Sequence, residues 1–139
     1  GYVYYSVGLW CYADIRKIDP KTGQFSSVAD LKLADNGVRV SPEGDFIVFS
    51  SQPEDDHACG RGWFYLAYSK MNSTPEILFR TTFPHFAGNP VLSPDGSKVL
   101  FATDEPSRSL HQILDLKTRS IQELPIEGSN DNVDWGMVC

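Results

Sequence analysis

The sequence Val38-Arg39-Val40-Ser41-Pro42-Glu43-Gly44-Asp45-Phe46-Ile47-Val48-Phe49-Ser50 decides the fold, because it returns as Val91-Leu92-Ser93-Pro94-Asp95-Gly96-Ser97-Lys98-Val99-Leu100-Phe101-Ala102. The two serines are 52 positions apart. Proline sets φ for a turn, the acidic residue can bond nearby backbone amides, and glycine takes the positive φ that a tight reversal needs. The flanking residues are β-branched and aromatic, so each copy predicts a strand, a tight turn and a second strand paired as a hairpin.

A second element repeats out of phase with the first. Ile18-Asp19-Pro20-Lys21-Thr22-Gly23 corresponds to Leu114-Asp115-Leu116-Lys117-Thr118-Arg119, and a degraded copy occupies residues 68–73. Strand-like runs flank the two clear copies, and these predict strands over residues 13–18, 24–28, 111–116 and 120–124. Each repeat therefore contains four short strands, which we name a to d in chain order, and no segment has helical periodicity.

The Ser-Pro-Asp-Gly turn, preceded by a strand and followed by a strand that ends in Phe and a small residue, resembles the TolB-type β-propeller repeat. The resemblance covers nearly the whole chain. It implies an all-β fold of four-stranded antiparallel blades with strand a innermost, and it suggests a periplasmic or secreted protein. The motif is specific for fold and weak for function, because such propellers serve as binding platforms, lyases and accessory domains of peptidases.

The phase of the repeat predicts how the blades are divided. Residues 133–136 align with the strand that leads into Ser93, which predicts a further inner strand there. Residues 3–6 align with residues 47–50, so the sequence opens on a strand b. The turn-to-turn spacings of 44, 52 and 43 residues account for three whole repeats, with approximate blades at 1–40, 41–92 and 93–139 in a single unit cut at the a–b turn.

Three blades are fewer than the four to eight of typical propellers. An open arc would expose two apolar blade faces and two unpaired strand edges. We therefore expect half of a six-bladed ring, completed by a second copy in a homodimer. The alternative is that the sequence is one piece of a longer propeller.

Composition fits one globular unit and limits its partners. The 139 residues are 41% apolar, with a net charge of −6 and a pI near 4.9. Nonspecific binding to nucleic acid or to anionic lipid is disfavoured at that charge. No apolar run reaches the roughly 20 residues of a membrane span. We expect partners to be a second copy and an unknown protein or small ligand.

Three cysteines cannot all pair within one molecule, and their spacing matches no zinc or thiol redox motif. Three free thiols are the favoured interpretation for Cys11, Cys59 and Cys139. A Cys11–Cys59 disulfide in an oxidising compartment is the alternative.

In the arrangement implied by the resemblance, the b–c and d–a connections lie together on one face, which we call the loop face, opposite the Ser-Pro-Asp-Gly turns. Ligands commonly approach propellers from loops or from the mouth of the channel. The sequence places on this face residues 30–37, 51–62, 83–89, 104–109 and 125–132.

The loop 51–62 carries the least repeat-like sequence, including Asp55, Asp56, His57 and Arg61. Carboxylates and an imidazole so close together make a divalent metal conceivable. We favour a solvated acidic loop, since nothing in the local sequence completes a coordination shell, and we expect no cofactor.

Other candidate ligand-binding residues lie near the predicted inner strands. His85 precedes one inner strand, where it could reach the channel mouth or pack between two phenylalanines. Asp131 and Asp134 flank the last inner strand, and Arg39 lies on an equivalent strand, so these three residues could line the channel with mixed charge. His111 is expected to begin a strand c as an edge or blade-face residue.

No nucleophile elbow, His-Glu-x-x-His pair or glycine-rich phosphate loop is found in the sequence. Ser41 and Ser93 sit beside proline and are expected to be turn residues rather than nucleophiles. A non-catalytic binding or scaffold module is therefore favoured. The alternative is a metal-assisted, lyase-like carbohydrate enzyme that uses the Asp55–Asp56 pair with His57 and His85.

Overall fold

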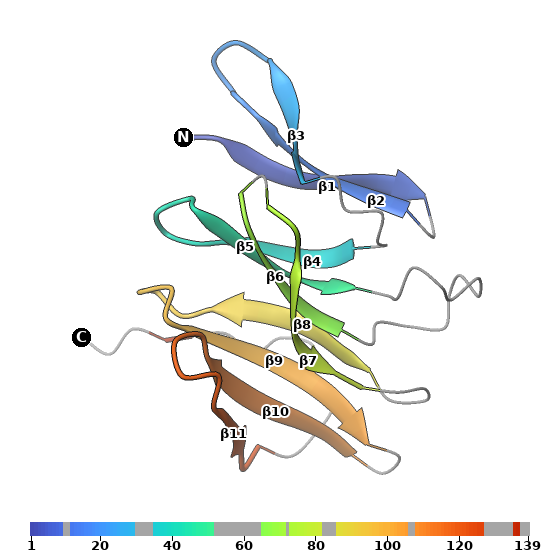
Figure 1. Cartoon of the computed structure of the whole chain (residues 1–139), viewed down its shortest axis with the longest axis vertical. Coiled ribbons are helices and arrows are strands. Elements are labelled where there is room, and N and C mark those ends of the chain that lie inside the picture. The colour runs from blue at the N-terminus through green and yellow to red at the C-terminus, as the bar shows by residue number, and fades with distance from the viewer. Residues whose placement is uncertain are drawn as a thin grey trace.

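The computed structural model describes residues 1–9, 12–29, 35–51, 65–71, 73–81, 86–105, 108–126 and 135–136. Every regular element within them is a β-strand, and the strands form three stacked antiparallel sheets (Figure 1). The first sheet contains β1 (Val3–Leu9), β2 (Tyr12–Ile18) and β3 (Phe25–Ala29). The second contains β4 (Asp35–Val40), β5 (Phe46–Ser51), β6 (Tyr65–Lys70) and β7 (Glu76–Arg80). The third contains β8 (Ala87–Leu92), β9 (Lys98–Glu105), β10 (Arg108–Asp115) and β11 (Ile121–Leu124).

Strand order confirms the predicted all-β blade. Strands that follow one another in the chain are neighbours in each sheet, with β4 first in the second sheet and β8 first in the third. These two strands a also pack beside each other, so they form the inner edge shared by the stacked blades. In the first sheet, β1 pairs with β2 alone among the described strands, which leaves its other edge open.

The apolar cores lie between the sheets. Ile47 and Phe49 of β5 pack with Ile15 and Val28 of the first sheet, while Val48 of β5 packs in the opposite direction. The second core joins Val48 and Leu66 to three residues of the third sheet, which are Val99, Phe101 and Leu114. Alternate residues of one strand thus enter two cores, as expected for a strand covered on both faces.

The inner strands begin earlier than the sequence predicted. We expected residues 30–37 and 83–89 to be loops, yet β4 starts at Asp35 and β8 at Ala87. A β-bulge interrupts the pairing of each strand with its neighbour, and Gly37 and Asn89 at these bulges have φ of 64° and 51°. A bulge allows a strand to continue through residues that do not alternate, so the sequence pattern hid these starts.

The expected loop 104–109 is also largely strand. β9 runs to Glu105 and β10 starts at Arg108, with Glu105 paired to Arg108. The ladder extends beyond the residues of high β-propensity because each added pair extends an existing hairpin, which local propensity does not record.

The predicted c–d turns are present in both clear copies. Asp19 accepts hydrogen bonds from the amides of Lys21 and Gly23, and Asp115 accepts them from Lys117 and Arg119 in the same way. Arg119 occupies the position of Gly23 and has a φ of 63°. Its guanidinium lies 3.1 Å from Glu76 Oε2 and stacks over Tyr68, both on the second sheet. The larger residue thus gains contacts with the neighbouring blade at a position that favours glycine.

Among the described residues, no helix is long and apolar enough to cross a bilayer.

Neighbouring a–b turns touch through a glycine and a proline. Gly96 has a φ of 71°, and a Cβ added to it would lie 2.9 Å from Pro42 Cδ. Gly23 has the same φ, but a Cβ there would meet nothing within 4 Å. The two glycines therefore share a backbone conformation and differ in the space around them.

We expect Gly23→Ala to cost about 1 kcal/mol, because the left-handed region is unfavourable for an L-residue. Gly96→Ala should cost roughly 1–3 kcal/mol more, because overpacking against Pro42 adds to the same strain. Urea unfolding of the two variants measures the difference. Equal losses of stability would show that the contact between turns contributes nothing.

Candidate functional site

Most of the predicted ligand-binding residues lie outside the described part of the chain. These are Asp55, Asp56, His57, Arg61, His85, Asp131 and Asp134. Arg39 is described, and it lies on β4 with an exposed side chain. Its Nη1 donates a hydrogen bond to the carbonyl oxygen of Val38 at 3.0 Å. The position of this guanidinium at the channel stays a prediction.

Asn89 is a second exposed polar residue of the inner strands, and the sequence analysis missed it. It lies on β8, which packs beside β4, and a Cβ on Gly37 of β4 would lie 3.2 Å from Pro90 Cδ. The repeat could have predicted the positive φ of Asn89. Asn89 and Gly37 both precede their turn serine by four positions, and glycine is typical of a positive φ. Asparagine tolerates this conformation better than most residues.

The contact between β5 and β8 contains a buried hydroxyl. Ser50 is 2% exposed, and its Oγ has no hydrogen-bond partner among the described residues. A Cβ on Gly88 would lie 3.5 Å from this oxygen. Ser50 can therefore offer one donor and acceptor group close to the bulge of β8, near the start of that strand.

Two hydrogen bonds between Phe86 and Asp104 hold the start of β8. The amide of Phe86 donates to Asp104 Oδ1, and the amide of Asp104 donates to the carbonyl oxygen of Phe86 at 3.3 Å. His111 was expected to begin a strand c as an edge or blade-face residue, and the predicted start is wrong because β10 begins at Arg108. It is the fourth residue of β10, it is buried, and it pairs with Ala102 on one side and Leu124 on the other.

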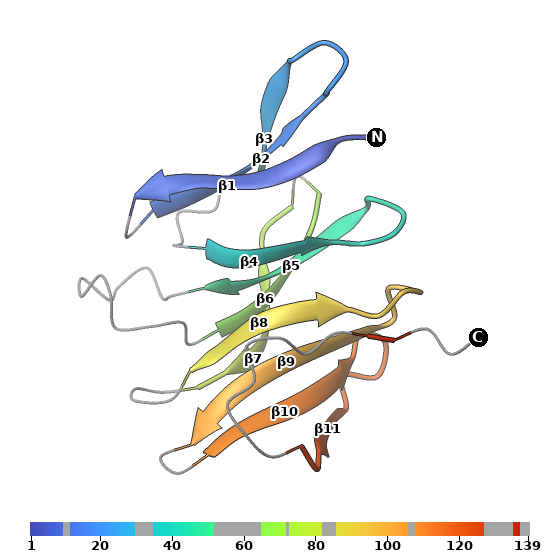
Figure 2. The same cartoon turned by 180° about the vertical axis from the view of Figure 1, so that it is seen from behind.

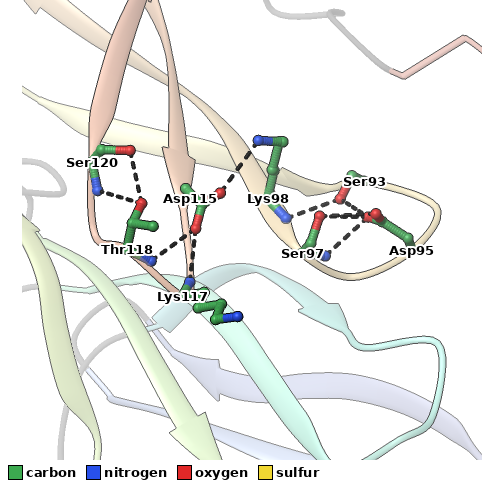
Figure 3. A network of polar contacts seen from close by, with 8 residues as sticks. All are labelled: Ser93, Asp95, Ser97, Lys98, Asp115, Lys117, Thr118 and Ser120. Atoms are coloured by element: carbon green, nitrogen blue, oxygen red, sulfur yellow. Dashed lines mark hydrogen bonds and ion pairs between the residues drawn. The ribbon is translucent and has the colours of Figure 1, made fainter.

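The two turn serines are buried and engaged in their turns, as predicted. Ser41 Oγ donates to Asp45 Oδ1 at 2.6 Å. Ser93 Oγ donates to Asp95 Oδ1 at 2.6 Å, and Figure 3 shows this second bond. Each hydroxyl also accepts the amide of the first residue of the following strand, Phe46 or Lys98. A hydroxyl held in this way stabilises the turn.

The acidic partner of the serine changes place between the two copies. In the second copy it is the third turn residue, Asp95, followed two positions later by Ser97. In the first copy Glu43 stands at the third position, and Asp45, two positions later, binds the hydroxyl instead. Two different sequences thus place one carboxylate against the same hydroxyl.

Two carboxylates are stabilised as anions by this framework. Hydrogen bonds from the Ser93 hydroxyl and then from the Ser97 amide lower the pKa of Asp95 to about 2. The amide of Thr118 is the largest cause that lowers the pKa of Asp115 to about 2, with further help from Lys117 and from Lys98, whose Nζ lies 3.3 Å from Oδ2. Figure 3 shows both carboxylates within the hydrogen bonds of their turns.

The described residues contain no group of three or more histidine, cysteine, aspartate or glutamate side chains placed to hold a metal ion. Within this part of the chain, the arrangement offers polar groups for binding on the inner strands. Among these groups are the guanidinium of Arg39 and the amide of Asn89, whereas the hydroxyl of Ser50 on β5 is buried.

Comparison with solved structures identifies the fold. TolB from Acinetobacter baumannii matches with a TM-score of 0.65 and 22% identity, over 82% of this chain and 27% of that one. A protein assigned as TolB from Agrobacterium tumefaciens matches with a TM-score of 0.68 and 18% identity, over 88% of this chain and 44% of that one. An oligogalacturonate lyase in complex with manganese matches with a TM-score of 0.60 and 13% identity, over 81% of this chain and 30% of that one.

The chain therefore has the fold of TolB-type β-propeller blades, and it spans less than half the length of each of these proteins. No protein-family model matches the sequence, and no curated protein matches it either. At these identities the likeness to solved structures shows the fold alone and does not show the function.

The lowered pKa of Asp95 gives a pH-dependent prediction. Because the folded pKa lies below the unfolded value of 3.8, the carboxylate contributes stability above about pH 4, and this contribution is lost as the pH falls through 2. Asp95→Asn keeps the shape and removes the charge. We expect the variant to unfold at lower urea concentration than the parent at pH 7, and the two midpoints to converge toward pH 2. A difference that stays constant over this range would refute the assignment.

Proposed function

We propose that this chain is a three-blade β-propeller unit that acts as a non-catalytic binding or scaffold module. The observation that carries the proposal is the contrast between two sets of polar residues. The turn serines are tied into hydrogen bonds that hold the fold. Arg39 and Asn89 on the inner strands are exposed, although strand pairing requires neither side chain.

The proposed ligand, a protein segment or a small molecule, binds at the loop face or the channel mouth. Arg39 supplies a cation there, and Asn89 supplies an amide. The candidate residues of the loops and of the last inner strand would add both signs of charge: Asp55, Asp56, His57, Arg61, His85, Asp131 and Asp134. Mixed charge of this kind suits a ligand with several polar groups.

We propose further that two copies form a six-bladed ring as a homodimer. The support comes from β1, whose outer edge pairs with no other described strand, and from Val3 on that strand. Val3 is 53% exposed, whereas Ile47 and Val99, the equivalent residues of β5 and β9, are fully buried between sheets. A second copy would cover this face with a blade of matching shape.

A metal-assisted, lyase-like carbohydrate enzyme is the second candidate. It is favoured by the likeness to the oligogalacturonate lyase, which extends to fold alone. The residues that would hold a divalent metal are Asp55, Asp56, His57 and His85, whose side chains are oxygen and imidazole ligands.

Metal titration separates the two candidates. A binding module should show the same melting temperature with and without Mn²⁺, Ca²⁺ or Zn²⁺, and the purified protein should carry no metal at stoichiometric level. Stoichiometric metal that is lost in an Asp56→Ala, His57→Ala double variant would overturn the non-catalytic proposal. Arg39→Ala, which leaves those ligands intact, is the matched control.

The ring is tested by mass and by concentration. Sedimentation should give a species of twice 15.5 kDa at micromolar concentration, and the unfolding midpoint should rise with protein concentration because dissociation accompanies unfolding. A well-folded monomer with a concentration-independent midpoint would reject the homodimer.

A further inference from the structure

The two complete sheets show how a strand a docks on a strand b. In the second sheet Val40 lies opposite Ile47, and in the third sheet Leu92 lies opposite Val99. The next residue, Ser41 or Ser93, donates its amide to the carbonyl oxygen of Phe46 or Lys98 at 2.9 Å. The same register therefore occurs twice within one chain.

The equivalent positions on β1 have no such partner among the described strands. By the repeat, Val3 corresponds to Ile47 and Val99, and Tyr2 corresponds to Phe46 and Lys98. Tyr4 packs against the core between the first and second sheets, so Val3, one position earlier on the strand, faces away from the second sheet. β1 lacks proline, lysine and acidic residues, the usual protections of an exposed edge.

Trp135 lies beside the third sheet, at the position where the next strand a would end. It corresponds to Leu92 in the repeat, and its Nε1 donates to the carbonyl oxygen of Val91 on β8 at 3.2 Å. Figures 1 and 2 show residues 135–136, coloured red, near the third sheet, whereas β1 lies at the opposite end of the stack. Within one chain, Trp135 thus lies beside the third sheet and Val3 lies on the first sheet, at opposite ends of the stack.

We propose that in the homodimer Trp135 of one copy lies opposite Val3 of the second copy, with Gly136 opposite Tyr2, in antiparallel register. This inference rests on the proposed ring and specifies how its sheets are joined. The faces agree, because Leu92 and Val99 both pack toward the preceding sheet. Trp135 and Val3 would in the same way face the third sheet of the copy that supplies Trp135. The partner of β1 is therefore a strand of this chain's own inner-strand type.

Cysteine crosslinking tests the register. In the 139-residue chain with Cys11, Cys59 and Cys139 replaced by serine, Val3→Cys is combined with Trp135→Cys. Residues opposite each other in an antiparallel pair have Cα atoms about 4.5–5.5 Å apart, which a disulfide can join. We expect mild oxidation to link two chains, visible as a dimer on a non-reducing gel that a reductant restores to monomer.

Val7→Cys with Trp135→Cys is the matched control, because Val7 is also exposed and lies on the same face of β1. Val7 lies four positions along the strand from Val3, about 13 Å away, so crosslinking there should be roughly tenfold slower. A second pair, Tyr2→Cys with Gly136→Cys, keeps the indole of Trp135. A Cβ on Gly136 meets nothing within 4 Å, so this substitution does not depend on repacking.

The outcomes separate the register from the ring. Fast linkage through positions 3–135 and 2–136 supports the inference. A dimer in sedimentation that links equally fast or faster through positions 7–135 overturns the register and leaves the homodimer in place. A cysteine-free protein that sediments as a folded monomer overturns both.

Discussion

A single serine hydroxyl holds each turn between a strand a and a strand b, and the blade behind it depends on that turn. The hydroxyl accepts the amide of the first residue of strand b and donates to a carboxylate two or four positions away. These two hydrogen bonds fix where strand b starts relative to strand a. They thereby also fix the position of the bulged strand a that leads into the turn. Neighbouring turns then meet through Gly96 and Pro42, and neighbouring inner strands meet through Gly37 and Pro90. Two glycine–proline contacts thus set the separation of the second and third blades at two places.

The sequence was sufficient to predict the blades because turn chemistry is local. Serine, proline, an acidic residue and glycine act within a few positions of each other, so two copies of the pattern located both a–b turns. Strand boundaries were less predictable, because they depend on pairs formed across a sheet. β9 and β10 extend to Glu105 and Arg108 through mutual pairing, and β4 and β8 continue through bulges. Arg119 shows the same limit, since its contacts with Glu76 and Tyr68 join segments far apart in the sequence.

The candidate site was only partly accessible to sequence reasoning. Arg39 was found because its strand was recognised from the repeat, and the structure places its side chain in solvent on that strand. Asn89 was missed because an Asn-Pro pair before a turn motif is typical of a loop, whereas here it occupies a bulge within β8. Ser50 could not be singled out, since its burial results from packing of β5 against β8. The other candidate residues lie outside the described part of the chain, so their positions stay predictions.

The location of the apolar cores explains why the ends of the stack differ from its middle. Each core is shared by two sheets, so the second sheet contributes to two cores, while the first contributes to one among the described residues. The repeated positions on strand b make the consequence measurable, because Ile47 and Val99 are fully buried and Val3 is half exposed. A hydrophobic residue gains stability in proportion to the area removed from water. Within the described fold, the same position of the sequence pattern therefore removes more apolar area from water on β5 and β9 than on β1.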